Sequence, residues 1–182
     1  MSKIKLKRVE ITFPNLWQTA TFGGEDTGKY DATFLIDKSD EKTVNHLKRA
    51  ISAIIKEKFK GKNPGADRIC LRDGDELDKD YTVGKYVIKA NNKRRPLIVD
   101  KDRSPIIEDD DKCVGGDIVN AIIDFWAQDN QFGKRINANL LGVQFVKEGE
   151  RHQATKTANP DDFDAEIDDD DDDDGDIEDF LV

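Results

Sequence analysis

The sequence predicts a mainly β protein: a small OB-fold-like barrel with one inserted α-helix, followed by a disordered acidic C-terminal tail. Several short segments alternate apolar and polar residues between turns that are rich in glycine, which is typical of a sandwich or barrel. One early segment has the apolar spacing of a helix, and an inserted helix is typical of an OB-fold. The segment Gln153–Val182 carries 14 acidic residues and one lysine, so it cannot bury enough apolar surface to fold.

The first strand is expected at Lys3–Phe13. Its apolar residues change phase between Leu6 and Val9, so a bulge near Lys7–Arg8 is needed to bring all of them, Phe13 included, onto one face. The other face then carries basic side chains.

Two extended segments are expected on either side of the flexible loop Gly23–Gly28. The first, Leu16–Phe22, places Trp17 on its polar face and Phe22 on its apolar face. The second is a strand that turns Tyr30 and Phe34 toward the core.

The clearest helix begins after Ser39 or Asp40, since either side chain can cap its first turn. Glycine and proline in Gly61–Gly65 end it. The apolar residues that recur at helical spacing are Val44, Leu47, Ile51 and Phe59.

The rest of the body is expected to contain more strands. Ile69 and Leu71 indicate a short one. Lys85–Ala90 and Leu97–Asp100 flank the basic connection Asn91–Arg95, which predicts a hairpin. A second hairpin is formed by Asp117–Ala127 and Ile136–Val146. The inward residues of its two strands are expected to be Val119, Ala121, Ile123, Phe125, Leu141, Val143 and Phe145.

Charge divides the chain into a domain, residues 1–152, and a tail, residues 153–182. The whole chain has a formal charge of -10, but removing the tail's 14 acids and one lysine leaves 25 acidic and 28 basic residues in the body. The body is therefore weakly basic and suited to a polyanion. No apolar run reaches the roughly 20 residues of a membrane span, and the N-terminus lacks a signal-peptide pattern, so we expect a cytoplasmic protein without membrane contact.

No catalytic motif is found in the sequence, so a non-enzymatic protein is expected. Cys70 and Cys113 stand apart, and the two histidines do not complete a zinc pattern, which predicts reduced structural thiols and no metal or other cofactor. One alternative is a metal-dependent nuclease that uses the acidic clusters at Asp73–Asp78 or Glu108–Asp111. Another is an acidic protein that mimics DNA.

Aromatic rings on polar faces beside basic clusters indicate binding of single-stranded nucleic acid. Such binding combines a basic groove, which follows the phosphates, with exposed rings that stack on bases. Trp17 and Trp126 lie on polar faces and Phe132 lies at a loop tip, whereas Tyr86 shares the phase of Ile88 and Ala90 and is also compatible with the core. The candidate nucleic-acid-binding residues are Lys3, Lys5, Lys7, Arg8, Trp17, Lys85, Tyr86, Lys89, Lys93, Arg94, Arg95, Trp126, Phe132, Lys134 and Arg135.

The acidic tail is expected to compete with nucleic acid for the basic groove, because it is a polyanion held close by its own chain. Seven consecutive aspartates, Asp168–Asp174, supply much of its charge. The chain then ends on Phe180, Leu181 and Val182, an apolar tip that a pure solubility tail does not need. These three residues are the candidate partner-binding residues, for replication or recombination proteins.

The order of these motifs resembles that of the phage single-stranded DNA-binding family formerly called DUF2815. The resemblance rests on KIKLKRVEITFPNLW at the start, GKYDATFLID before the helix, VGGDIVNAIIDFWAQDN and GKRINANLLGVQFVKEG late in the body, and the acidic tail. A more distant similarity is to the single-stranded DNA-binding proteins of short-tailed lytic phages. The chain ends Asp-Phe-Leu-Val, whereas bacterial members of the wider class often end on Pro-Phe.

The resemblance implies an OB-fold, sequence-independent binding of single strands and recruitment of phage replication or recombination proteins through the tail. Such a protein serves DNA replication, recombination or repair. The sequence leaves open whether the chain is a monomer or a homodimer, whether duplex DNA binds more weakly, and whether RNA is also a ligand.

Overall fold

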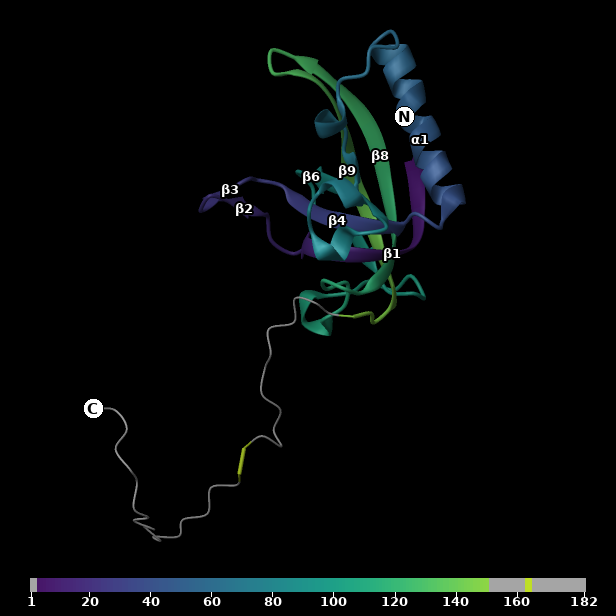
Figure 1. Cartoon of the computed structure of the whole chain (residues 1–182). Helices are drawn as coiled ribbons and strands as arrows, with labels where there is room; N and C mark the ends of the chain where they lie inside the picture. The colour runs from purple at the N-terminus through teal and green to yellow at the C-terminus, as the bar shows by residue number, and fades with distance from the viewer. Residues whose placement is uncertain (1–2, 151–162, 165–182) are drawn as a thin grey trace, which may run out of the picture.

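Residues 3–150 and 163–164 are described by a computed structural model, and their main feature is a closed five-stranded barrel (Figure 1). The strands follow the order β1–β4–β6–β9–β8 and return to β1. Among the pairings of these five strands, only β6–β9 is parallel. This is the strand order of an OB-fold. The barrel strands are β1 (Lys3–Asn15), β4 (Tyr30–Asp37), β6 (Lys85–Asn92), β8 (Ile118–Asn130) and β9 (Gly133–Lys147).

Several short strands and 3-10 turns lie outside the five barrel strands. The strands β2 (Thr21–Phe22) and β3 (Glu25–Asp26) form a separate small hairpin. The strand β5 (Leu71–Asp73) extends the sheet beside β6, and β7 (Leu97–Val99) runs parallel to β9. Four 3-10 turns are η1 (Ala66–Arg68), η2 (Gly74–Glu76), η3 (Asp80–Thr82) and η4 (Glu108–Asp110).

The bulge expected in β1 is confirmed. The pairing with β8 shifts between Leu6 and Val9, and Arg8 takes a positive φ of 52°. A second irregularity follows, because the pairing with β4 shifts between Thr12 and Asn15. The prediction that Phe13 faces the core is therefore wrong: its φ is 48° and its side chain is 49% exposed.

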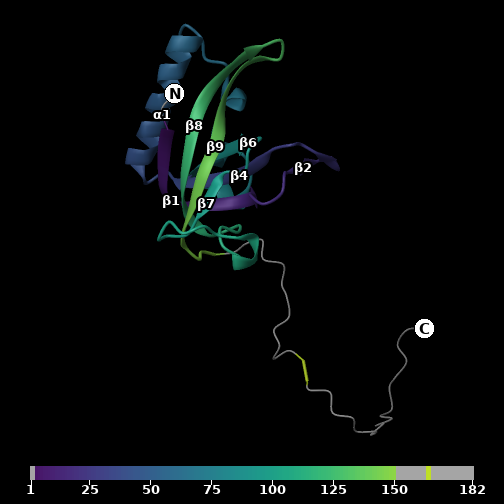
Figure 2. The same cartoon turned by 180° about the vertical axis from the view of Figure 1, so that it is seen from behind.

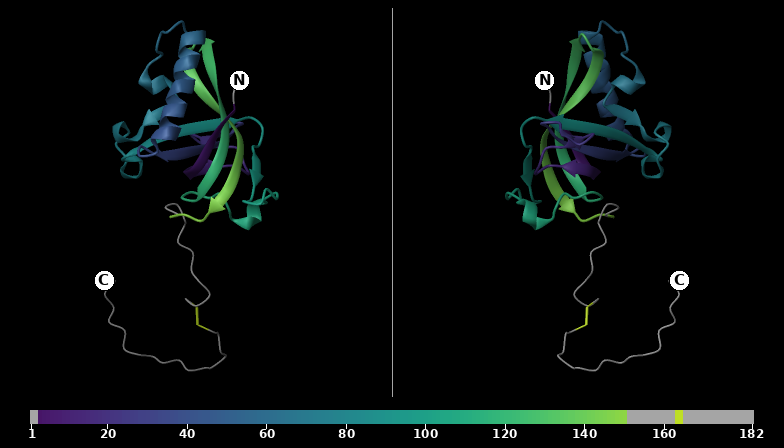
Figure 3. Two further views of the ribbon diagram at one scale, coloured as in Figure 1. Left: turned by 90° about the vertical axis from the view of Figure 1, so that its right-hand side faces the viewer. Right: turned by 90° about the vertical axis from the view of Figure 1, so that its left-hand side faces the viewer.

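The predicted helix is present as α1 (Glu41–Lys58). A carboxylate oxygen of Asp40 accepts a hydrogen bond from the Thr43 backbone N–H at 3.3 Å, which caps the first turn. Val44, Leu47 and Ile51 are buried in the core. The helix lies along the upper half of the β8–β9 ribbon (Figure 3). Among the described residues, no helix is long and apolar enough to cross a membrane.

The hairpin expected around Asn91–Arg95 is not formed. Both β6 and β7 pair with β9 instead, and both run parallel to it. The basic connection between them therefore passes along β9. The local pattern could not reveal this, since each short strand is equally compatible with either neighbour.

The second predicted hairpin, β8–β9, is confirmed, with one error of phase. Leu140 is fully buried, whereas Leu141 is only half-buried. The pairing shifts here, so that Ile122 lies opposite Gly142 and Ile123 lies opposite Leu140. A bulge of this kind turns an extra residue out of register and restores the inward phase for Val143.

Candidate nucleic-acid interface

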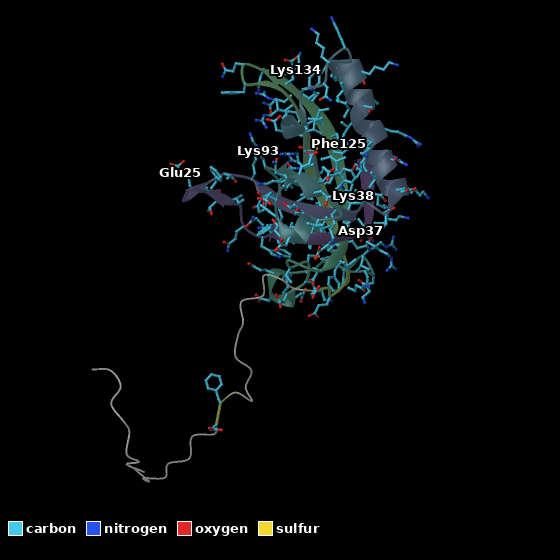
Figure 4. The ribbon with its side chains drawn as sticks, in the orientation of Figure 1. Glu25, Asp37, Lys38, Lys93, Phe125 and Lys134 are labelled. Carbon is cyan, nitrogen blue, oxygen red and sulfur yellow. The ribbon has the colours of Figure 1, made fainter. Side chains whose placement is uncertain are left out.

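The outer face of β4 and β6 is flanked by two projecting hairpins, β2–β3 and the tip of β8–β9 (Figure 1). Lys93 lies between them in the view of Figure 4. In OB-folds, the second and third strands and the loops next to them form the ligand surface, and these are the corresponding elements here. We call this surface the inter-hairpin face. Its aromatic and basic residues are Trp17, Phe22, Tyr30, Lys89, Lys93, Arg94, Arg95, Phe132 and Arg135.

Arg95 holds together the base of the first hairpin. Its Nη2 donates a hydrogen bond to the carbonyl oxygen of Trp17 at 2.9 Å. Its guanidinium carbon lies 5.8 Å from the centre of the Trp17 ring and 5.4 Å from the centre of the Tyr30 ring. A guanidinium at this distance is attracted to the faces of aromatic rings, so the three side chains form one cluster.

The β2–β3 hairpin carries Phe22 outward, with 85% of its surface exposed. Gly23 and Gly24 both have positive φ, as a two-residue hairpin turn requires. The base of the hairpin is fixed by Asp26, whose carboxylate accepts hydrogen bonds from the Thr19 hydroxyl at 2.6 Å and the Gly28 N–H at 2.8 Å. These bonds favour the ionised form and lower the pKa of Asp26.

The tip of the β8–β9 hairpin presents Phe132, which is 71% exposed. Its N–H donates to the Asn130 side chain at 2.9 Å, and its carbonyl oxygen accepts from Arg68 Nη1 at 3.3 Å. A side chain at Gly133 would lie 2.4 Å from the same Arg68 nitrogen, so glycine lets Arg68 approach the turn. The backbone under the exposed ring is therefore held in place.

Positive charge dominates the inter-hairpin face. Lys93, Arg94 and Arg135 are exposed, and none has an ion-pair partner in the part of the chain that the structure describes. Lys89 lies 3.8 Å from a carboxylate oxygen of Asp31 on β4, which pairs with Asn91, two residues further along β6. Phosphate groups would meet mainly unpaired cations here.

The basic residues of β1 lie elsewhere. Lys3, Lys5, Lys7 and Arg8 point outward from the half of β1 that pairs with β8. Lys7 and Arg8 line a depression of about 570 Å3, together with Lys85. Lys85 is also 3.4 Å from a carboxylate oxygen of Glu10.

Three further predicted site residues lie on the α1 side of the barrel. The Tyr86 ring lies beneath two lysine ammonium groups, with Lys48 Nζ 4.8 Å from its centre. Trp126 lines a cavity next to α1. Lys134 Nζ lies 5.2 Å from the Phe59 ring centre. Since α1 and the β2–β3 hairpin lie on opposite sides of the barrel (Figures 1 and 2), these residues do not join the inter-hairpin face.

Two residues of the acidic clusters considered for a nuclease, Asp73 and Asp75, are paired with one lysine. Lys38 Nζ lies 2.7 Å from Asp73 and 2.5 Å from Asp75. Within the described ranges, no three His, Cys, Asp or Glu side chains group as a metal ligand set. The tip residues Phe180, Leu181 and Val182, and the boundary between residues 152 and 153, lie outside the described residues.

Sequence reasoning missed two residues of this face, Phe22 and Tyr30, and one contact that supports its second hairpin. Phe22 was assigned to an apolar face, although its place next to Gly23-Gly24 was a signal for a hairpin tip. Tyr30 was assigned to the core, yet it is half-buried under Arg95. Arg68 reaches Phe132 across 64 positions of the chain, and no local pattern predicts such a contact.

Comparison with known families decides the class of the protein. Residues 2–175 match the model of the family described as "Enterobacter phage Enc34, ssDNA-binding protein". The chain belongs to this family. A curated relative is a putative protein p50 of Acyrthosiphon pisum secondary endosymbiont phage 1. It is 36% identical over 173 residues, which cover 89% of this chain and 92% of the relative.

Solved structures agree with the family. The single-stranded DNA-binding protein from bacteriophage Enc34, in complex with single-stranded DNA, has a TM-score of 0.74 at 30% identity, covering 82% of this chain and 89% of that chain. The single-stranded DNA-binding protein of bacteriophage T7 has a TM-score of 0.56 at 10% identity, covering 87% of this chain and 99% of that one. This second likeness concerns the fold alone.

Proposed function

We propose that this protein is a non-enzymatic, sequence-independent single-stranded DNA-binding protein that acts in phage DNA replication, recombination or repair. The observation that carries the proposal is the match to the Enc34 protein, which was solved in complex with single-stranded DNA and aligns with 82% of this chain. It works in the host bacterial cytoplasm, where it coats exposed strands and shields them from nucleases.

The DNA strand crosses the inter-hairpin face in this proposal. Phe22 and Phe132 at the two tips are available to stack on bases, and the Trp17 ring adds an aromatic surface beside the first hairpin. Stacking on a side-chain ring contributes about 1–3 kcal/mol per base and does not depend on the base, which suits a protein without sequence preference.

Phosphates are held by the basic residues of the same face. Lys93, Arg94 and Arg135 are exposed and free of acidic partners among the described residues. Binding releases counterions, so affinity falls steeply with salt. Duplex DNA binds more weakly, because its paired bases cannot stack on the rings, while RNA binds by the same contacts because none of them reads the sugar.

The acidic tail lowers the affinity for DNA and recruits partner proteins. Its 14 acidic residues are tethered to a basic body, where a flexible segment reaches an effective concentration in the millimolar range. A long strand displaces it from the basic surface. The terminal Phe180-Leu181-Val182 is then offered to replication or recombination proteins.

A titration with nucleic acids tests the proposal. The full-length protein and a variant with asparagine at all seven positions Asp168–Asp174 are titrated with oligo(dT) and with duplex of equal length at two salt concentrations. Tryptophan fluorescence is the readout. We expect quenching by oligo(dT), weaker binding of duplex, and tighter binding by the asparagine variant.

Two other results would contradict the proposed function and favour a different one. Absence of oligo(dT) binding by both proteins at low salt would overturn the DNA-binding function and favour an acidic protein that mimics DNA. Cleavage of labelled strands in magnesium or manganese, abolished by Asp73→Ala or Asp109→Ala, would favour a nuclease instead.

A further inference from the structure

A cavity of about 610 Å3 lies between α1 and the adjoining ends of β1 and β8. Residues of α1 line the cavity, and α1 lies on the side of the barrel opposite the β2–β3 hairpin (Figures 1 and 2), so the cavity is separate from the inter-hairpin face. Phe125, one of its lining residues, is labelled close to α1 in Figure 4. We call it the α1–β8 pocket.

The α1–β8 pocket has an apolar floor and a basic rim. Ile54 and Phe125 contribute apolar surface. The rim carries Lys3, Arg49 and Lys58, all exposed, with Glu57 as the only acidic lining residue among those the structure describes. A pocket of this kind suits an apolar side chain that arrives attached to negative charge.

Trp126, one of the lining residues, carries an unused hydrogen-bond donor. This residue lines the pocket, and its Nε1 is buried without a hydrogen-bond partner in the described part of the chain. Leaving a buried N–H unpaired is costly, and a carboxylate or carbonyl oxygen is the group that would satisfy it.

A row of basic residues connects this pocket with the place where the tail leaves the barrel. Gly149 N–H donates to the buried Asp117 carboxylate at 3.3 Å, which holds the end of the body against β8. Glu150 then lines the same depression as Lys7 and Arg8. From there Lys5 and Lys3 continue along the outer face of β1, and Lys3 lines the α1–β8 pocket.

We propose that the C-terminal tip of this chain, Phe180-Leu181-Val182, docks in the α1–β8 pocket of the same molecule when no partner is bound. The Phe180 ring enters the apolar floor, and the terminal carboxylate accepts from Trp126 Nε1 and lies near the basic rim. The preceding aspartates lie along the Lys3–Arg8 row. A partner protein must displace the tip from its own pocket.

The tail is long enough for this path. The 30 residues from 151 to 180 have a root-mean-square end-to-end distance of about 30 Å as a flexible chain. From Arg8 to Lys3 the strand rises only about 17 Å. Docking therefore needs no stretching, and the excess length lets the tip leave and return.

The two indole N–H groups of the chain provide a test, because Trp17 and Trp126 are its only tryptophans. Their 15N–1H cross-peaks are recorded in the full-length protein and in the double variant Phe180→Ala, Leu181→Ala, with Trp126→Phe to assign them. We expect the double variant to move the Trp126 peak and to leave the Trp17 peak in place. Movement of the Trp17 peak alone, or of neither, would overturn the proposal.

Matched charge variants identify the pocket. A synthetic peptide of residues 171–182 is added to the full-length double variant, and the Trp126 peak is expected to return toward its wild-type position. Arg49→Glu on the rim should weaken this peptide about fivefold or more, since it reverses a charge beside an acidic ligand. Lys56→Glu, an exposed change on the same helix outside the pocket, should leave the affinity within twofold.

Two further measurements test whether a second copy of the chain or DNA, rather than the tip of the same molecule, occupies the α1–β8 pocket. If the wild-type Trp126 peak moves to the double-variant position on dilution, a second copy of the chain supplies the tip and the proposal fails in its present form. Oligo(dT) added to the double variant should move Trp17 and not Trp126. A shift of Trp126 that Arg49→Glu abolishes would assign the pocket to DNA and overturn tip docking, while the DNA-binding function itself would stand.

Discussion

Arg95 donates a hydrogen bond from Nη2 to the carbonyl oxygen of Trp17, 2.9 Å away, although the two residues are 78 positions apart in the sequence. The same guanidinium lies over the Trp17 and Tyr30 rings. One cation thus fixes the root of the β2–β3 hairpin and remains exposed at the surface where DNA is proposed to bind. Basic and aromatic groups act there as one unit.

The substitution Arg95→Lys keeps the positive charge but removes the planar guanidinium, so it tests whether the shape of the Arg95 side chain matters for DNA binding. The guanidinium of Arg95 is a rigid planar group that contacts the Trp17 carbonyl oxygen and both rings at once, and the single ammonium group of lysine cannot do this. We expect Arg95→Lys to lower oligo(dT) affinity about fivefold, a loss of about 1 kcal/mol, and to change the Trp17 emission. Arg94→Lys, the exposed neighbour, is the matched control and should have little effect. Fluorescence titration measures both, and equal losses would contradict the role assigned to Arg95.

Truncating Phe132 should weaken DNA binding without changing the stability of the fold. Because its ring is 71% exposed, little buried surface is lost in Phe132→Ala. The loss of one stacked base predicts a cost of about 1–3 kcal/mol in binding to oligo(dT). Ile107→Ala, at an exposed apolar residue outside the inter-hairpin face, serves as the control. An unchanged affinity would show that no base stacks at this tip.

Neutralising Asp31 should strengthen DNA binding. Its carboxylate lies 3.8 Å from Lys89 Nζ and competes with phosphate for that cation. In Asp31→Asn, the amide keeps an oxygen that can accept the 2.7 Å hydrogen bond from Asn15. We expect oligo(dT) affinity to rise about threefold at low salt and the salt dependence to steepen. Asp129→Asn, which frees Lys134 on the α1 side, should raise the affinity less.

The contacts of Lys38 predict a pH dependence of stability. Hydrogen bonds from Lys38 lower the pKa of Asp73 and of Asp75, and the same bonds raise the pKa of Lys38. Depressed carboxyl pKa values stabilise the fold above the ordinary value near 3.8, and this contribution is lost as the pH falls through the folded-state values. The raised pKa of Lys38 also contributes to stability, and this contribution is lost only in strong alkali.

Urea unfolding of the wild type and Lys38→Met across pH measures this contribution. The difference in unfolding free energy should be constant from about pH 5 to pH 9 and should shrink below about pH 4. Lys42→Met, an exposed change on α1, should show no such acid limb. A difference that persists unchanged at low pH would mean that packing against Tyr86, rather than charge, explains the effect of the substitution.

Both thiols should react slowly in the folded protein. Burial raises the pKa of Cys70 to about 12 and that of Cys113 to about 12. At pH 8 only about one thiol in ten thousand is then ionised, and the thiolate is the reactive form. Labelling with a disulfide reagent should be slow in buffer and fast in guanidinium chloride. Rapid labelling of Cys70 in buffer would contradict the raised pKa of this half-buried thiol.

The sequence by itself determined the class of the fold and most of its elements. The β1 bulge, the capped helix α1, the β8–β9 hairpin and the charge division of the chain follow from patterns within a few residues of one another. Local periodicity and turn chemistry operate over those distances, so they are readable in the sequence. The motif order also indicated the family to which the chain belongs.

Only the tertiary structure decided which candidate residues share a surface. Trp17 and Trp126 were equivalent in the sequence, yet one lies under Arg95 and the other beside α1. Phe13 and Leu141 do not face the core as expected, because the strand register shifts at a bulge next to each of them. Such bulges arise where paired strands follow paths of different length around a curved barrel. Closure of the barrel is set by contacts between distant segments, and those contacts place the two hairpins on one side and the Lys3–Arg8 row on the other.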